Sequence, residues 1–123
     1  MKLFVREPES GALAAFVPGD ATLVSSALAL VEVTRTVRVA GLEDEVEGGP
    51  EALLDGVVLI DVDRSILSRA AALASATLRS LDAIHLSTAA LVEPEVMLVY
   101  DRGLRQAAGS VGLRVAAPGA APE

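Results

Sequence analysis

Two segments of the chain are rich in consecutive apolar side chains, many of them β-branched. Residues 57–62 and residues 96–100 have this pattern, which is typical of strands covered on both faces of a sheet. Shorter apolar runs at residues 22–24 and 113–115 favour two further strands.

Helices are predicted between these strands, and small polar residues suited to capping precede three of them. The predicted caps and helices are Ser25 or Ser26 before residues 27–39, Asp63 before residues 64–74, and Ser80 before residues 81–92. Two shorter helices are predicted over residues 8–16 and 104–108. Strands that alternate with helices indicate a mostly parallel sheet with helices on both faces, which is the α/β class.

The length and composition narrow the range of structures and functions. A chain of 123 residues fits one domain, and we assign residues 1–115 to it and residues 116–123 to a flexible tail. The chain has no cysteine, which excludes a zinc finger, a disulfide framework, an iron–sulfur cluster and a thiol nucleophile. It also lacks the glycine-rich motif of a dinucleotide site, the P-loop motif and the GxSxG elbow of serine hydrolases.

The net charge of −7 has the wrong sign for a protein that holds nucleic acid by bulk electrostatic attraction. No uncharged apolar stretch is long enough to span a membrane, and the first residues lack the apolar core of a secretion signal. We therefore expect a cytoplasmic protein without a membrane segment.

Three acidic residues stand at positions suited to chemistry. Glu32 has apolar neighbours in its predicted helix, Asp82 lies in the first turn of another, and Asp101 follows a predicted buried strand. Asp82 and Asp101 could instead stabilise helix N-termini. Glu32 could pair with Arg35 or Arg38 on its own helix. Taken together, carboxylates without a cluster of cysteines or histidines favour Mg²⁺ or Mn²⁺, which can activate water at a phosphodiester.

His85 is the single histidine of the chain and follows Asp82 by about one helical turn. Because no serine stands in a nucleophile elbow, a catalytic relay through His85 is disfavoured. We interpret His85 as a packed residue or as one that supports a ligand from behind.

Three segments of the chain resemble those of a known family. Residues 78–89 (LRSLDAIHLSTA) resemble the signature segment of PIN-domain ribonucleases. The resemblance is strongest to the VapC toxins of bacterial VapBC toxin–antitoxin pairs. The family's strand-end aspartate segment resembles residues 100–108 (YDRGLRQAA), and its glutamate-bearing helix resembles residues 25–35. These segments occur in the family's order over nearly the whole chain.

The resemblance implies a PIN-like three-layer α/β/α domain that acts as a Mg²⁺-dependent endoribonuclease toxin, with Mn²⁺ as a possible substitute. It implies that Glu32, Asp82 and Asp101 are the catalytic, metal-binding acids, and that the partners are a VapB-type antitoxin, an RNA substrate and a second copy of the chain. Arg79 and Arg102, beside two of these acids, could contact the phosphates of RNA.

The chain departs from the family pattern at its N-terminus. The family begins with an apolar strand that ends in a fourth aspartate, whereas residues 2–9 resemble the helix that follows this strand. We therefore expect the first strand and its aspartate to be missing, with Met1 as a misassigned start. The alternative function is a catalytically inactive PIN domain that binds an antitoxin or RNA.

Overall fold

The computed structural model describes residues 2–6, 19–73 and 78–117. Within these ranges five strands form one sheet in the order β3-β2-β1-β4-β5, and all four pairings are parallel. The strands are β1 (Lys2–Val5), β2 (Thr22–Ser26), β3 (Val57–Ile60), β4 (Val96–Leu98) and β5 (Val115–Ala116). The predicted α/β class with a parallel sheet is confirmed.

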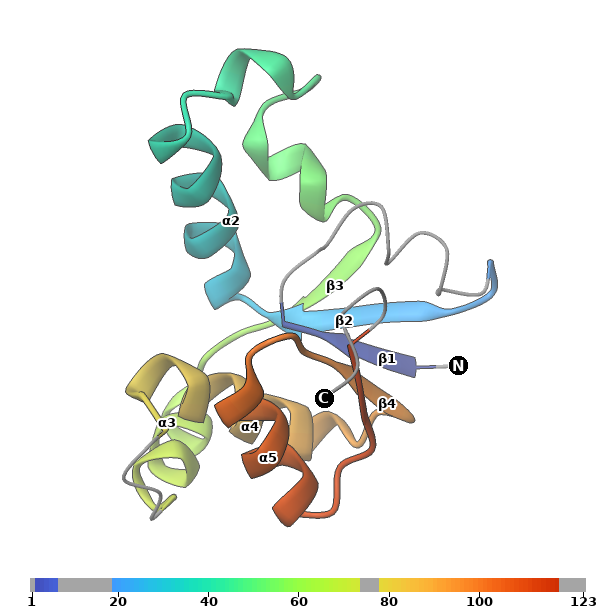
Figure 1. Cartoon of the computed structure of the whole chain (residues 1–123), viewed down its shortest axis with the longest axis vertical. Helices are drawn as coiled ribbons and strands as arrows, with labels where there is room; N and C mark the ends of the chain where they lie inside the picture. Colours follow the sequence, from blue (N-terminus) through green and yellow to red (C-terminus); the bar gives the residue numbers. More distant parts are fainter. Residues whose placement is uncertain (1, 7–18, 74–77, 118–123) are drawn as a thin grey trace.

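Helices flank this sheet. The described ones are α2 (Leu28–Val39), α3 (Arg64–Ala71), α4 (Ser80–Val92) and α5 (Arg102–Ser110). Short 3₁₀ turns cover Glu43–Glu45 and Pro50–Leu54. Figure 1 shows α3, α4 and α5 together on one side of the sheet and α2 on the other. The helix predicted over residues 8–16 lies outside the described residues.

Strand β1 corrects the expectation for the N-terminus. Residues 2–5 form a central strand between β2 and β4, so the prediction that they begin a helix is wrong. The physical reason is their composition, since Leu3, Phe4 and Val5 are consecutive apolar residues and all three are buried. A run of this kind suits a strand covered on both faces. Arg6 follows directly, at the carboxyl end of the strand.

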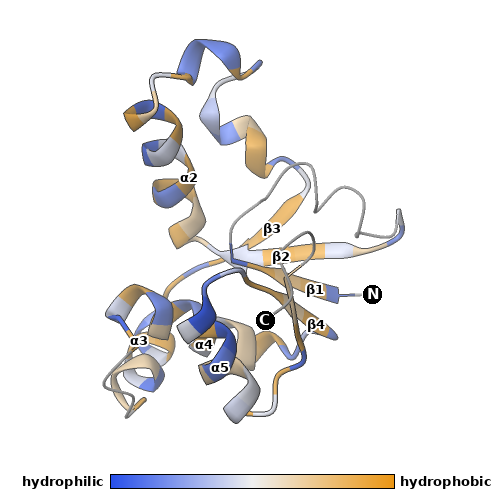
Figure 2. Ribbon diagram, viewed as in Figure 1, coloured by the Kyte–Doolittle hydropathy of each residue, from blue (hydrophilic) through white to orange (hydrophobic). Residues whose placement is uncertain are grey.

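Side chains of the central strands alternate between the two faces of the sheet. On one face Phe4, Val24 and Met97 belong to a core cluster that includes Leu86 of α4 and Leu104 of α5. A second cluster lies on the opposite face and contains Leu3, Val5, Val96 and Leu98. Figure 2 shows the apolar colouring along these strands. Packing on both faces anchors the carboxyl ends of β1 and β4.

The structure differs from the sequence-based prediction at several positions and confirms it at one helix cap. Val58 in β3 is 49% exposed, contrary to the prediction of a strand covered on both faces, because β3 lies at the edge of the sheet. The predicted cap Asp63 is confirmed, since its Oδ1 accepts a hydrogen bond from the Ile66 amide. Ser80 is the first residue of α4 and not its cap, a position that Arg79 takes. Ala116, expected in the tail, lies in β5.

Across the described ranges, no helix combines the length and the apolar character needed to cross a membrane.

Candidate active site

The three predicted acids and one arginine lie near the carboxyl edge of the parallel sheet. Arg6 directly follows β1, and Asp101 is the third residue after β4. Glu32 projects from the helix after β2. Asp82 lies in the first turn of α4, which packs under the same strands. Ligands of open parallel α/β sheets bind at this edge, so the position itself points to a functional site.

Glu32 faces the interior because the apolar pattern of α2 orients it. Ala29 and Val33 are buried on the same helix, and the Glu32 side chain is only 19% exposed. Its Oε1 lies 2.5 Å from Nε2 of His85, and its Oε2 lies 3.4 Å from Nη2 of Arg6. Within the described chain, the ion-pair partners of Glu32 are therefore Arg6 and His85 rather than Arg35 or Arg38.

The electrostatic environment favours the ionised form of Glu32. Burial raises the pKa of the Glu32 carboxyl, but the hydrogen bond and charge of His85 and the charge of Arg6 outweigh it. The net result is a pKa below its ordinary value.

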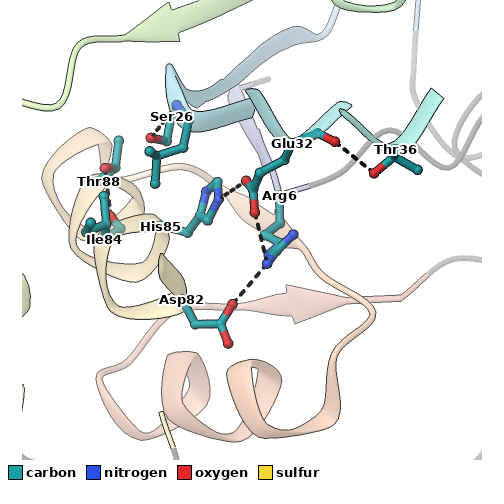
Figure 3. Close-up of polar contacts among 9 residues, drawn as sticks. Arg6, Ser26, Glu32, Thr36, Asp82, Ile84, His85 and Thr88 are labelled. Carbon is teal, nitrogen blue, oxygen red and sulfur yellow. Dashed lines mark hydrogen bonds and ion pairs between the residues drawn. The ribbon is translucent and has the colours of Figure 1, made fainter. Parts of the chain in front are cut away.

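Arg6 joins two of the predicted acids. Its Nη2 lies 3.0 Å from Oδ1 of Asp82 in addition to its contact with Glu32, so one nitrogen is shared by carboxylates from two helices. The side chains of Arg6 and Asp82 are 15% and 16% exposed, which shields this contact from solvent. Figure 3 shows the Arg6 guanidinium between the two carboxylates, with His85 on the far side of Glu32. Hydrogen bonds of this charged kind are shorter and stronger than neutral ones.

Asp101 and Asp82 line one cleft. The cleft has a volume of about 730 Å³, and Arg6, Arg79 and Tyr100 also contribute to its wall. Oδ2 of Asp101 accepts a hydrogen bond of 2.8 Å from the Leu104 amide and so caps α5. The helix-end role considered for Asp101 is thus real.

The structure links the three predicted acids in two pairs rather than as one cluster. Arg6 joins Glu32 to Asp82, and the cleft joins Asp82 to Asp101. In the part of the chain that the structure describes, no three Asp, Glu or His side chains form a group arranged to hold a metal ion. Of the two predicted phosphate contacts, Arg79 lines the cleft, whereas Arg102 is the exposed first residue of α5.

The sequence pattern did not single out Arg6, because the residues around it were expected to be helical. The available signal was a cation placed directly after three consecutive apolar residues, which is where a buried strand reaches the edge of its sheet. The packed or supporting role expected of His85 agrees with its complete burial and its contact with Glu32.

Comparison with known proteins identifies the class of this fold and site. Residues 1–110 match the PIN domain family. The chain therefore belongs to the PIN-domain family.

Its similarity within that family is to VapC ribonucleases. Ribonuclease VapC46 of Mycobacterium tuberculosis is 41% identical over 120 residues, which cover 96% of this chain and 91% of the relative. Ribonuclease VapC35 of the same species is 40% identical over 129 residues, covering 98% and 93% of the two chains. A solved toxin–antitoxin complex from Klebsiella pneumoniae matches with a TM-score of 0.54 and 25% identity, over 73% of this chain and 69% of that one. This is a PIN-domain protein of the VapC type.

Proposed function

We propose that this protein is a divalent-cation-dependent endoribonuclease toxin whose acids are Glu32, Asp82 and Asp101. The supporting observation is that carboxylates of α2 and α4 converge on one cationic nitrogen at the carboxyl edge of the sheet. The named activity of the VapC relatives makes RNA the substrate class that we favour.

The chemistry of the donor set fits Mg²⁺ or Mn²⁺. Glu32, Asp82 and Asp101 offer carboxylate oxygens, the ligands that hard divalent cations prefer, and the chain has no thiolate to favour a softer ion. The place between Glu32 and Asp82 already holds positive charge, because Nη2 of Arg6 lies there. We therefore assign the cation to these three acids, with Arg6 withdrawn from them.

The bound cation would lower the pKa of a water molecule and neutralise charge on a phosphodiester. The other contributions come from the chain itself. Asp82 and Asp101 stand on the cleft wall, where they would orient the attacking water, and Arg79 would contact a neighbouring phosphate. Arg102, on the exposed first turn of α5, would make a further phosphate contact. Water attacks phosphorus and the P–O3′ bond breaks, which leaves a 5′-phosphate and a 3′-hydroxyl.

A cleavage assay tests this function. The protein is incubated with RNA in millimolar Mg²⁺ or Mn²⁺, in EDTA, and with Asp82→Asn in place of the native chain. We expect cleavage to require the cation and to fall about a hundredfold or more in the variant, since loss of a direct ligand exceeds the 10–100-fold typical of supporting residues. Activity that survives both EDTA and Asp82→Asn would exclude the mechanism.

We further propose that the protein pairs with an antitoxin and forms homodimers. The structural match to a toxin–antitoxin complex supports the first partner. The Arg6 contacts support a mode of inhibition, since they demonstrate that a guanidinium fits between Glu32 and Asp82. An arginine supplied by the antitoxin would compete with the cation in the same way. Dimerisation is tested by the mass of the purified protein in solution.

Two observations favour the second candidate function, a catalytically inactive binding module. Arg6 neutralises two of the acids, and no described group of three acids is arranged for a metal ion. Tight antitoxin binding without RNA cleavage at millimolar Mg²⁺ would favour this module.

A further inference from the structure

The imidazole of His85 is buried against the back of the candidate site. His85 is 0% exposed, and its Nε2 lies 2.5 Å from Oε1 of Glu32. The two residues are 53 positions apart, so this contact joins α4 to α2 and is created by the fold.

The two oxygens of Glu32 have different surroundings. Oε1 is engaged by His85, whereas Oε2 is the oxygen that contacts Arg6 beside Asp82. His85 therefore holds the carboxylate at Oε1, and Oε2 is turned toward Arg6 and Asp82. Figure 3 shows this sequence of groups, from His85 through Glu32 and Arg6 to Asp82.

Helix α4 places Asp82 and His85 on one face, because residues three apart on a helix are neighbours. The same helix face thus supplies one carboxylate directly and determines the orientation of a second carboxylate, that of Glu32. A shift of α4 would move both acids together.

We propose that His85 is a positioning residue that orients Glu32 for cation binding, an inference that rests on the proposed role of Glu32. The hydrogen bond from Nε2 to Oε1 limits the rotation of the carboxylate, so that Oε2 faces the cation without a further loss of side-chain freedom. His85 touches neither the cation nor the RNA in this arrangement.

A role in packing alone explains the site less well. Nδ1 of His85 is buried and has no hydrogen-bond partner among the described residues. Leaving a polar ring atom unpaired in the interior costs free energy that an apolar side chain of similar size would avoid. The contact with Glu32 is the feature that an apolar side chain could not reproduce.

The test is calorimetric titration of Mn²⁺ into the full chain and three variants. His85→Gln keeps an N–H group with the reach of Nε2, whereas His85→Asn has an N–H group that stops short of Glu32. Thr88→Val is the matched control, since Thr88 is equally buried on α4 and its hydroxyl bonds the Ile84 carbonyl of its own helix.

We expect Mn²⁺ affinity to fall about 10–100-fold in His85→Asn, and to stay within about threefold of native in His85→Gln and Thr88→Val. Equal affinity in His85→Asn and the native chain would overturn the proposal. So would equal losses in all three variants, which would indicate damage to packing. Circular dichroism and melting temperature check that each variant folds, and the Mn²⁺ affinities of His85→Gln and His85→Asn are compared on folded protein.

Glu32→Gln separates this inference from the proposed function. If Glu32→Gln binds Mn²⁺ as tightly as the native chain, Glu32 is not a ligand and the proposed site is wrong. If Glu32→Gln weakens binding and His85→Asn does not, only the positioning role is wrong. Adding His85→Asn to Glu32→Gln should weaken binding no further, because the second change acts through Glu32.

Discussion

Nη2 of Arg6 lies 3.0 Å from Oδ1 of Asp82, although the two residues are 76 positions apart in the chain. The pair joins the end of the central strand β1 to the first turn of α4. Because the same nitrogen also reaches Glu32, one guanidinium balances two carboxylates that would otherwise repel each other. Under the proposed function, a cation has to displace Arg6 before it can bind these two acids.

Arg6→Gln is expected to raise Mn²⁺ affinity by about tenfold, which corresponds to about 1.4 kcal/mol. The substitution removes a positive charge that occupies the carboxylates, so the cation no longer has to displace it. The metal-free variant should also be less stable by about 1–3 kcal/mol, since two partly buried carboxylates lose a charged partner. Calorimetry with Mn²⁺ and urea unfolding measure the two effects.

The matched control for Arg6→Gln is Arg35→Gln, an exposed arginine on α2. This control carries the same change in net charge and should alter neither the Mn²⁺ affinity nor the stability measurably. Equal Mn²⁺ affinities in the two variants would contradict competition between Arg6 and the cation.

Asp101 has two roles that different substitutions separate. Asp101→Ala removes both the cap of α5 and the charge, and should cost about 1 kcal/mol of stability. Asp101→Ser keeps an oxygen able to accept from the Leu104 amide, so stability should be nearly retained. Mn²⁺ binding should weaken about tenfold or more in both variants. Full affinity in Asp101→Ser would remove Asp101 from the set of ligands.

The contribution of Glu32 to stability should depend on pH. Its pKa in the folded protein is lowered, so the ionised form stabilises the fold above the unfolded pKa of about 4.3, and this contribution is lost as pH falls through the folded pKa. Glu32→Gln should therefore be less stable than the native chain at pH 7, with a difference that shrinks below about pH 4. Urea unfolding of both chains without metal, from pH 3 to pH 7, measures this.

Glu45→Gln provides the comparison, because Glu45 is an exposed carboxylate on a 3₁₀ turn. Its stability should follow that of the native chain throughout the pH range. A constant difference between Glu32→Gln and the native chain down to pH 3 would contradict the lowered pKa.

Arg79→Gln should weaken RNA binding without changing Mn²⁺ affinity, because Arg79 lines the cleft but is not one of the proposed ligands. If Arg79 neutralises one phosphate of single-stranded RNA, the slope of log affinity against log salt should fall by about 0.7. Fluorescence anisotropy with labelled RNA at several salt concentrations measures the slope. Arg69→Gln on α3 is the control, and an equal change of slope in both variants would indicate a general effect of net charge.

The sequence by itself determined the fold class and most element positions. The apolar runs at residues 57–60 and 96–98 became β3 and β4, and the helix predicted over residues 27–39 became α2. These signals are local, since they arise from the spacing of apolar side chains within a single helix or strand. The family resemblance also directed attention to Glu32, Asp82 and Asp101, whose ligand roles remain predictions.

The tertiary structure decided which residues share the site and which strand lies at its centre. The burial of β1 between β2 and β4 brought Arg6 to the carboxylates, and the packing of α4 beneath the sheet brought His85 to Glu32. Neither contact has a local signature, because the partners are far apart in the chain and meet only when parallel strands align their carboxyl ends. Local patterns specify which segments can pack, whereas the pairing of charges at the sheet edge follows from strand order and helix placement.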